Sequence, residues 1–270
     1  MRAADFPYLD APTPLALAHR GGAAYGPNQG LENTLAAFRR AIDMGYRYVE
    51  TDVHATSDGR LVAFHDSVLD RVSDTRGAIA ALTYDAVREA RVAGAEPIPL
   101  LAELFEEFPG VRVNIDIKSD AALAPTIREV LRHRAAERVC VASFSERRLR
   151  AARAALGPRV ATAAGQVGTA LLRFTPSLVS RLLHTPAPVL QIPALHRLGS
   201  RTVTLVTPGL VRRAHGLGKQ VHVWFHPWAQ EDAPEMHRLL DLGVDGIVTD
   251  HIHVLRDVLA DRGHPLGPPS

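Results

Sequence analysis

The segment YVETDVHA, residues 48–55, is predicted to form a strand whose two faces differ in chemistry. Alternate side chains of a strand point to opposite faces, so Glu50, Asp52 and His54 share one face, while two valines and a threonine take the other. We expect the apolar face to pack on helices, which turns the acidic face inward. Two carboxylates in such a place repel each other and are costly to desolvate unless a positive charge lies between them.

A second predicted strand, within residues 111–118, repeats this pattern. Asn114, Asp116 and Lys118 share one face, and two isoleucines take the opposite face. Asp116 therefore joins the two carboxylates, and Lys118 adds a fixed cation. Three carboxylates without a cysteine ligand suit a hard divalent cation, Mg²⁺ or Ca²⁺. The alternative is a buried ion-pair network in which Lys118 and Arg20 balance the three carboxylates.

On either side of these two segments, short β-rich runs alternate with amphipathic helical patterns along most of the chain. Strands are predicted at Leu15–His19, Tyr48–Ala55, Val111–Lys118, Val139–Phe144, Val160–Gly165, Val189–Leu195, Val221–Phe225 and Gly246–Thr249. Helices are predicted at Leu31–Met44, Ala121–Arg134, Ser145–Leu156, Pro208–Leu217, Ala233–Leu242 and His251–Arg262. This alternation predicts an α/β fold of the (β/α)₈ TIM barrel type. An open doubly wound sheet is the alternative, but no G-x-G-x-x-G follows the first strand.

One segment does not fit a simple strand–helix unit. Residues Asp66–Pro99 are interpreted as a small insertion after the second βα unit, following an extra strand at Leu61–His65. The tail Gly263–Ser270 is rich in proline and glycine and is predicted to be disordered. Because α/β barrels routinely form one unit of about 250 residues, we expect residues 1–270 to make a single TIM-barrel domain.

Composition excludes several classes of protein. The 270 residues are 46% hydrophobic and 22% charged, with a formal net charge of +2 and no block of like charges, so no nucleic-acid partner is expected. The single cysteine, Cys140, cannot form an internal disulfide. No secretory signal and no apolar run of roughly 18 residues is evident, so we expect a cytoplasmic protein without a membrane span. The oligomeric state is not indicated.

Two histidines occupy predicted strand ends, where barrel enzymes place their chemistry. His19 ends the first strand and His65 ends the extra strand. Two imidazoles can divide general acid and general base work near neutral pH, although a single strand-end histidine more often has a structural role. Arg20 can hold a phosphate with its guanidinium fork, and the two glycines that follow let backbone approach an anion. The histidines of the C-terminal third, including His222, are interpreted as polar surface and not as a metal cluster.

Together these residues resemble the glycerophosphodiester phosphodiesterase family, over about Leu15 to Leu255. The ordered set of motifs at strand ends is specific, whereas any one tripeptide is not. The motifs are His19-Arg20-Gly21, Glu32-Asn33-Thr34, Glu50-Thr51-Asp52-Val53, Ser57-Asp58-Gly59, Leu61-Val62-Ala63-Phe64-His65-Asp66, Pro97-Ile98-Pro99-Leu100-Leu101-Ala102-Glu103-Leu104, Asn114-Ile115-Asp116-Ile117-Lys118, Val221-His222-Val223-Trp224 and Gly243-Val244-Asp245-Gly246-Ile247-Val248-Thr249-Asp250.

The resemblance implies metal-dependent hydrolysis of a small-molecule glycerophosphodiester to sn-glycerol 3-phosphate and an alcohol. It also implies roles for individual residues. By this resemblance His19 and His65 are the acid/base pair, and Glu50, Asp52 and Asp116 are the ligands of a divalent metal. Arg20 and Lys118 contact the phosphate, Trp224 forms an aromatic wall of the substrate pocket, and Glu32 and Asn33 brace the first loop. The resemblance does not tell which histidine is the acid.

Three departures from the family pattern concern the metal and the substrate. Asp116 stands where the family usually has a glutamate, which shortens that ligand by one methylene. The loop Ala23–Gly30 is longer than usual, and Leu31 replaces a proline. After Trp224 the family tends to Thr-Val-Asn, whereas here the sequence is Phe225-His226-Pro227-Trp228. The resemblance therefore supports the cleavage of a phosphodiester more strongly than the recognition of glycerol.

Two other functions remain open. The first is lysophospholipase D activity, which an apolar pocket mouth would favour, lined by Leu171, Leu172 and Phe174 or by Phe225 and Trp228. The second is a non-catalytic barrel that binds a phosphate ligand. A binder needs only the cations, so the presence of both histidines and all three carboxylates argues against it.

Overall fold

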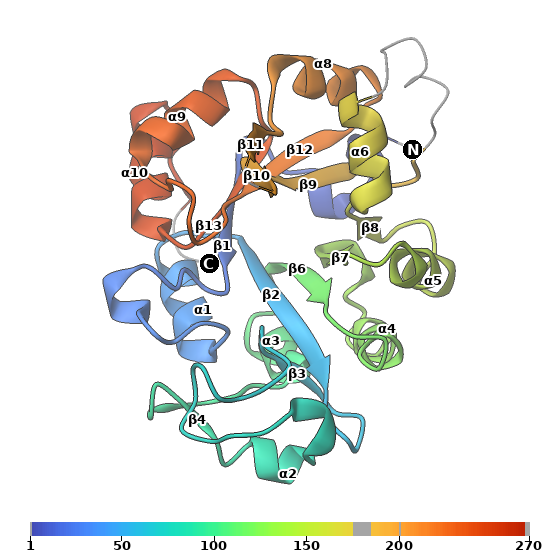
Figure 1. The fold of residues 1–270 in the computed structure, drawn as a ribbon, viewed down its shortest axis with the longest axis vertical. Helices are drawn as coiled ribbons and strands as arrows, with labels where there is room; N and C mark the ends of the chain where they lie inside the picture. Colours follow the sequence, from blue (N-terminus) through green and yellow to red (C-terminus); the bar gives the residue numbers. More distant parts are fainter. Residues whose placement is uncertain (1, 175–184, 200, 268–270) are drawn as a thin grey trace.

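The computed structural model describes residues 2–174, 185–199 and 201–267, and eight parallel strands form its centre (Figure 1). Their order around the sheet is β8-β7-β6-β2-β1-β13-β12-β9. Their bounds are β1 Leu15–His19, β2 Tyr48–Ala55, β6 Arg112–Ile117, β7 Val139–Ala142, β8 Ala161–Thr162, β9 Val189–Pro193, β12 Gln220–Trp224 and β13 Gly246–Thr249. A parallel bridge between Ala163 and Val189 joins the two ends of the sheet. The predicted TIM barrel is confirmed.

Helices surround the strands in Figure 1. They are α1 Leu35–Asp43, α3 Leu101–Glu107, α4 Leu123–Arg132, α5 Glu146–Leu156, α6 Gln166–Phe174, α8 Pro208–Gly216, α9 Ala233–Asp241 and α10 Ile252–Asp261. The helix predicted from Leu31 begins only at Leu35, because the Thr34 hydroxyl accepts a hydrogen bond from the Ala37 backbone N–H and caps the helix there. Ser145 caps α5 in the same way. Helices α3 and α6 were not predicted.

The strands bury both faces, as parallel strands do in a barrel. Outward-facing side chains such as Val49 and Val53 belong to the large core between strands and helices. Inward-facing side chains at the bottom of the barrel pack on the first residues of the chain, which form 3₁₀ turns at Ala3–Asp5 and Pro7–Leu9. The hydroxyl of Tyr48 donates to the backbone oxygen of Tyr8 at 2.8 Å. The amino-terminal end of the barrel is thus filled, and the strands' carboxyl ends lie at the opposite end.

The predicted insertion folds as a small unit beside the end of β2. β3 (Leu61–Ala63) pairs antiparallel with β2, and α2 (Tyr84–Val87), β4 (Arg91–Val92) and β5 (Glu96–Pro97) follow. Figure 1 shows α2 and β4 projecting beyond the ring of helices. The insertion has its own apolar cluster, which includes Phe64, Leu69 and Ile79. Its folding brings residues just after β3 to the mouth of the barrel.

A hairpin that was not predicted follows β9. The predicted strand Val189–Leu195 ends at Pro193, and Leu195 belongs instead to β10 (Leu195–Leu198), which pairs antiparallel with β11 (Arg201–Thr204). Further 3₁₀ turns lie at Gly26–Asn28, Ile79–Ala81 and Ala136–Arg138. The tail predicted to be disordered is described as far as Gly267, and within it Leu266 packs on the core. Across the described residues, every helix is too short or too polar to span a membrane.

Candidate active site

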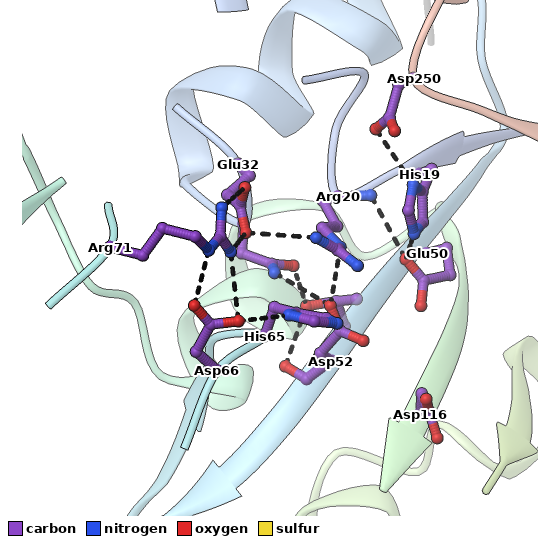
Figure 2. Close-up of polar contacts among 12 residues, drawn as sticks. His19, Arg20, Glu32, Glu50, Asp52, His65, Asp66, Arg71, Asp116 and Asp250 are labelled. Carbon is purple, nitrogen blue, oxygen red and sulfur yellow. Dashed lines mark hydrogen bonds and ion pairs between the residues drawn. The ribbon is translucent and has the colours of Figure 1, made fainter. Parts of the chain in front are cut away.

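His19 lies at the end of β1 between two carboxylates. Its Nδ1 is 3.0 Å from Asp250 Oδ1 and its Nε2 is 3.8 Å from Glu50 Oε2 (Figure 2). Asp250 directly follows β13, which is the neighbour of β1 in the barrel. Burial lowers the pKa of His19, but the charges of Asp250 and Glu50 outweigh it and raise the pKa to about 9. The protonated imidazolium is therefore the stabilised form in this pair of carboxylates.

His65 follows β3 and has a carboxylate partner of its own. Its Nδ1 is 2.6 Å from Asp66 Oδ1, and the backbone oxygen of His65 is 3.0 Å from His54 Nε2. Burial and the nearby charge of Arg20 lower the pKa of His65 below its usual range, against the opposite effect of Asp52 and Asp66. Because Nδ1 faces Asp66, Nε2 is the nitrogen left to exchange a proton with a substrate.

The three predicted carboxylates meet two cations. Asp52 and Asp116 are partners in the register of β2 and β6, and Lys118 Nζ lies 2.8 Å from an oxygen of each. Arg20 Nε is 3.1 Å from Asp52 Oδ2. These distances match the buried ion-pair network that the sequence left open as an alternative. Glu50 shares the inward face of β2 but faces His19 instead of the cations.

The neighbouring carboxylates of β2 differ strongly in acidity. Burial and the charge of Asp52 raise the pKa of Glu50 to about 7, against His19, Arg20 and Lys118. Burial also raises the pKa of Asp52, but Arg20 and Lys118 outweigh it and lower that pKa to about 2. The two cations thus balance Asp52 and leave Glu50 short of positive charge.

The donor set fits a hard divalent cation in its chemistry, although the side chains are not arranged around one. Within the described residues, no three His, Cys, Asp or Glu side chains lie together as a metal site. However, Glu50, Asp52 and Asp116 are all buried oxygen donors, and Asp116 Oδ1 is buried without a hydrogen-bond partner. The unpartnered oxygen and the raised pKa of Glu50 both indicate missing positive charge, and the flexible four-carbon stem of Lys118 can move its ammonium away from the two aspartates.

The loop after β1 takes its shape from close packing. Arg20 and Gly21 both have positive φ, at 50° and 86°. A Cβ at Gly21 would lie 2.8 Å from that of Ala37 in α1, and one at Gly22 would lie 2.6 Å from Ile252 in α10. Packing on these two helices therefore accounts for the glycines, which the sequence had suggested were needed for the approach of an anion.

Glu32 and Asn33, the two residues for which the resemblance implied a supporting role, both contact groups next to this loop. Asn33 has φ of 61°, donates from Nδ2 to Asp52 Oδ2 at 3.3 Å, and accepts from the hydroxyl of Thr51 at 2.8 Å. Glu32 Oε1 is 3.3 Å from Arg20 Nη1. Both residues therefore fix groups that face the carboxylates.

Arg71, from the insertion, links the carboxylate that holds His65 to the carboxylate that holds Arg20. Its guanidinium donates to both oxygens of Glu32, at 2.6 and 2.9 Å, and through Nε to Asp66 at 2.6 Å (Figure 2). Asp66 holds His65, while Glu32 holds Arg20. Sequence reasoning assigned no role to Asp66, Arg71 or Asp250. For the two aspartates a signal existed, because each directly follows a strand-end motif, but the spacing of Arg71 gave none.

Asp250 is itself supported by a partly buried glutamate, Glu231, that the sequence also did not single out. The Asp250 backbone N–H donates to Glu231 Oε1 at 2.8 Å, and the hydroxyl of Thr249 donates to the same oxygen at 2.5 Å. Burial raises the pKa of Glu231. The loop before α9 thereby fixes the residue that faces His19.

Trp224 lies in the other half of the barrel mouth, at the end of β12. It is partly buried and packs on the apolar cluster inside the barrel. Its ring meets that of His226 edge-on at 4.6 Å, and His226 stacks on Trp228 at 5.1 Å. Trp224 therefore belongs to an aromatic group and not to the ionic cluster around Asp52.

One histidine expected at the surface is instead inside the barrel. His222 is fully buried, and burial lowers its pKa to about 3. Its Nε2 is 3.0 Å from Gln220 Oε1. The expectation of polar surface was wrong here because alternate residues of β12 face inward, and His222 is one of them.

Known proteins are similar to this chain over most of its length. A model described as the glycerophosphoryl diester phosphodiesterase family matches residues 19–254. "Probable glycerophosphodiester phosphodiesterase 2" of Mycobacterium tuberculosis is 41% identical over 259 residues, which cover 92% of each chain. Lysophospholipase D GDPD1 of Homo sapiens is 29% identical over 275 residues, covering 90% of this chain and 85% of the human protein.

A solved structure is also similar. That of an Oleispira antarctica phosphodiesterase in complex with the product sn-glycerol-3-phosphate has a TM-score of 0.73 and 23% sequence identity. The match covers 92% of this chain and 97% of that chain. At this identity the likeness concerns the fold.

Proposed function

This chain belongs to the glycerophosphoryl diester phosphodiesterase family, and from that premise we propose that it hydrolyses glycerophosphodiesters to sn-glycerol 3-phosphate and an alcohol. The observation that carries the proposal is the pair of histidine–carboxylate contacts at the barrel mouth. His19 with Asp250 and His65 with Asp66 lie beside the carboxylates of β2, where a phosphodiester would meet two proton-transfer groups. A barrel that only binds phosphate would not need either pair.

The two histidines are proposed to share acid–base catalysis. His65 accepts the proton of the hydroxyl that attacks phosphorus, because Asp66, the carboxylate that contacts its Nδ1, is already shared with Arg71. His19 donates a proton to the leaving alcohol oxygen, because Asp250 and Glu50 both stabilise its charged form. Environments that push two titratable groups apart in this way suit one acid and one base.

Arg20 and Lys118 are proposed to contact the phosphate. Each is held by a buried carboxylate at the barrel mouth, Arg20 by Asp52 and Lys118 by Asp52 and Asp116. Donors fixed in advance stabilise the charge that grows on the equatorial phosphate oxygens without reorganising during the reaction. Asn33 and Glu32 keep this arrangement by holding Asp52 and Arg20.

Glu50, Asp52 and Asp116 are proposed to hold a divalent metal, Mg²⁺ or Ca²⁺. Buried oxygen donors, and an Asp116 oxygen without a partner, support a hard cation. When bound, such an ion polarises phosphoryl oxygens and lowers the pKa of a coordinated hydroxyl.

Lysophospholipid hydrolysis is the second candidate. The similarity to a human lysophospholipase D favours it, as do Leu171 and Phe174 of α6 and Trp228 after β12, which are 39%, 62% and 37% exposed. Two other residues expected at an apolar mouth, Leu172 and Phe225, are buried in the core instead. We place this candidate second because only part of the expected apolar surface is exposed.

A matched pair of substrates tests both candidates. Glycerophosphocholine and lysophosphatidylcholine share a head group and differ by an acyl chain. Release of sn-glycerol 3-phosphate from the former, with Mg²⁺, Ca²⁺ or Mn²⁺ and not with EDTA, is expected for the wild type and lost in His19→Ala. Strong preference for lysophosphatidylcholine would put the second candidate first, and no turnover of either with any metal would favour a phosphate-binding barrel.

A further inference from the structure

Four side chains form a continuous wall on the side of the barrel mouth opposite the ionic cluster. The Trp224 ring meets His226 edge-on at 4.6 Å, and the His226 ring stacks on Trp228 at 5.1 Å with 14° between the planes. The guanidinium carbon of Arg197, from β10, lies 4.1 Å from the centroid of the Trp228 ring. We call Trp224, His226, Trp228 and Arg197 the aromatic wall.

The aromatic wall is within reach of a substrate at the histidines. β12, which ends at Trp224, is separated from β1, which ends at His19, only by β13. Two strand spacings are about 10 Å, a distance that a phosphodiester and its alcohol group can span. Trp224 also packs on the apolar cluster inside the barrel, so its side chain lies over the barrel axis and not on the outer surface.

From this geometry we propose that the aromatic wall binds the alcohol part of the substrate and selects a hydroxyl-rich head group, such as inositol, over the quaternary ammonium of choline. The proposal rests on the phosphodiesterase function proposed above and adds the class of leaving alcohol to it.

The chain's own cation occupies the place where a quaternary ammonium would bind. An open tryptophan face attracts a cation, and aromatic cages for choline depend on that attraction. Here the Trp228 face already holds the Arg197 guanidinium at 4.1 Å. A choline group at the wall would therefore meet a fixed positive charge of the same sign instead of a free π face.

The same residues offer hydrogen-bond donors to hydroxyl groups. The guanidinium of Arg197 carries five N–H donors in a planar fork, and the half-buried His226 adds an imidazole. His196 lies beside it, with ring centroids 6.1 Å apart. Burial, His196 and Arg197 all lower the pKa of His226, which keeps this imidazole neutral and able both to donate and to accept. A polyol matches such a mixture of flat rings and donors.

The test compares the hydrolysis of glycerophosphoinositol and glycerophosphocholine by wild type, Arg197→Met, Arg197→Lys and Arg201→Met. Arg201 is a matched control, since it is an exposed arginine of the same hairpin, in β11. We expect the wild type to prefer glycerophosphoinositol in kcat/KM. Arg197→Met should lower the inositol-to-choline ratio about two- to fivefold, the range of a cation–π contact at an exposed site. Arg197→Lys keeps the charge but not the fork, so choline should remain disfavoured while turnover of glycerophosphoinositol falls.

Three results would overturn the selection by the aromatic wall. The first is a wild type that prefers glycerophosphocholine, the second is a ratio that changes equally in Arg197→Met and Arg201→Met, and the third is a ratio that does not change in Arg197→Met. If neither diester is hydrolysed under any metal condition, the phosphodiesterase function itself fails. Turnover of both diesters with an unchanged ratio in Arg197→Met would leave that function intact and remove only the selection by the aromatic wall.

Discussion

Both halves of the barrel mouth are built from side chains at or near strand ends. The charged half lies on β13, β1, β2 and β6, and the aromatic half lies on β12, the residues that follow it and β10. In the charged half, groups such as Asp52 and Lys118 are held at hydrogen-bond distance, 2.8 Å in this pair. In the aromatic half, ring centroids lie 4.6 to 6.1 Å apart. Buried charges are stable only with a partner in good geometry, whereas ring contacts tolerate a wider range. The charged half therefore suits the chemistry, and the aromatic half suits the choice of substrate.

The largest effect is expected from the histidines of the charged half. His19→Ala and His65→Ala should each lower kcat by about 10² to 10⁴, the usual contribution of one acid or base group. Neither should unfold the protein, since both side chains lie at the mouth and not in the apolar core. Steady-state kinetics against His264→Ala, an exposed histidine of the tail, is the check. Near wild-type turnover in both variants would refute the assignment.

Metal affinity should respond to the charged half alone. Asp116→Asn removes one of the proposed carboxylate ligands and should weaken Mg²⁺ or Ca²⁺ binding by about 10- to 100-fold, because affinity follows the charge of the ligands. Lys118→Met should tighten binding, since the ammonium lies 2.8 Å from the same carboxylates. Calorimetric titration without substrate measures both, with Asp257→Asn, an exposed residue of α10, as control. Unchanged affinity in Asp116→Asn would mean that the metal does not bind here.

Arg71 tests whether the insertion positions the charged half. Arg71→Met removes the donors to Glu32 and Asp66, and we expect kcat to fall about 10- to 100-fold, since small misplacement of catalytic groups is costly. Arg71→Lys should recover little, because one ammonium cannot replace the planar fork. The pH dependence of kcat should also shift, which a merely structural role would not cause. Arg76→Met, at an exposed site of the same insertion, should behave as the wild type.

The smallest effect is expected below the aromatic half, at His222. Its pKa is about 3 in the folded protein against an ordinary value of 6.5 for histidine, so between these values the unfolded state binds the proton more readily. As the pH decreases below 6.5, the free energy of unfolding should therefore decrease, and this group contributes about 1.4 kcal/mol of that decrease per pH unit. Denaturant unfolding at pH 7, 6 and 5 should show a smaller decrease in the free energy of unfolding for His222→Gln than for the wild type. An equal slope in both, with His264→Gln as control, would contradict this.

The period of two along the strands made the charged half predictable. It placed Glu50, Asp52 and Asp116 on inward faces, and the structure brings Asp52 and Asp116 into register. β1, β2 and β13 also have the bounds predicted from sequence. The face on which a strand residue lies and the bounds of a strand depend on residues close together in the chain, which is why a sequence alone suffices for them.

Features that depend on contacts between distant segments were not predictable in this way. Asp250 meets His19 only because the last strand pairs with the first, and Arg71 meets Glu32 across 39 residues of sequence. Helix α6 was missed, and so was the β10–β11 hairpin, although the two residues between its strands in the sequence, Gly199-Ser200, are a pair typical of two-residue hairpin turns. The inward position of His222 was missed although β12 itself was predicted.

The join between β8 and β9 gives the barrel a seam. Within the described residues, the parallel bridge of Ala163 with Val189 and the hydrogen bond from Ala164 N–H to the Val189 oxygen, 2.8 Å, are what tie these strands together, whereas β2 and β6 are in register over six residue pairs. Local opening of a protein is easiest where the fewest hydrogen bonds hold a segment in place. Amide hydrogens along β8 should therefore exchange with solvent faster than those of β2. Because β9 leads directly into the hairpin that carries Arg197, local opening between β8 and β9 would loosen the aromatic half of the mouth while the charged half stays rigid.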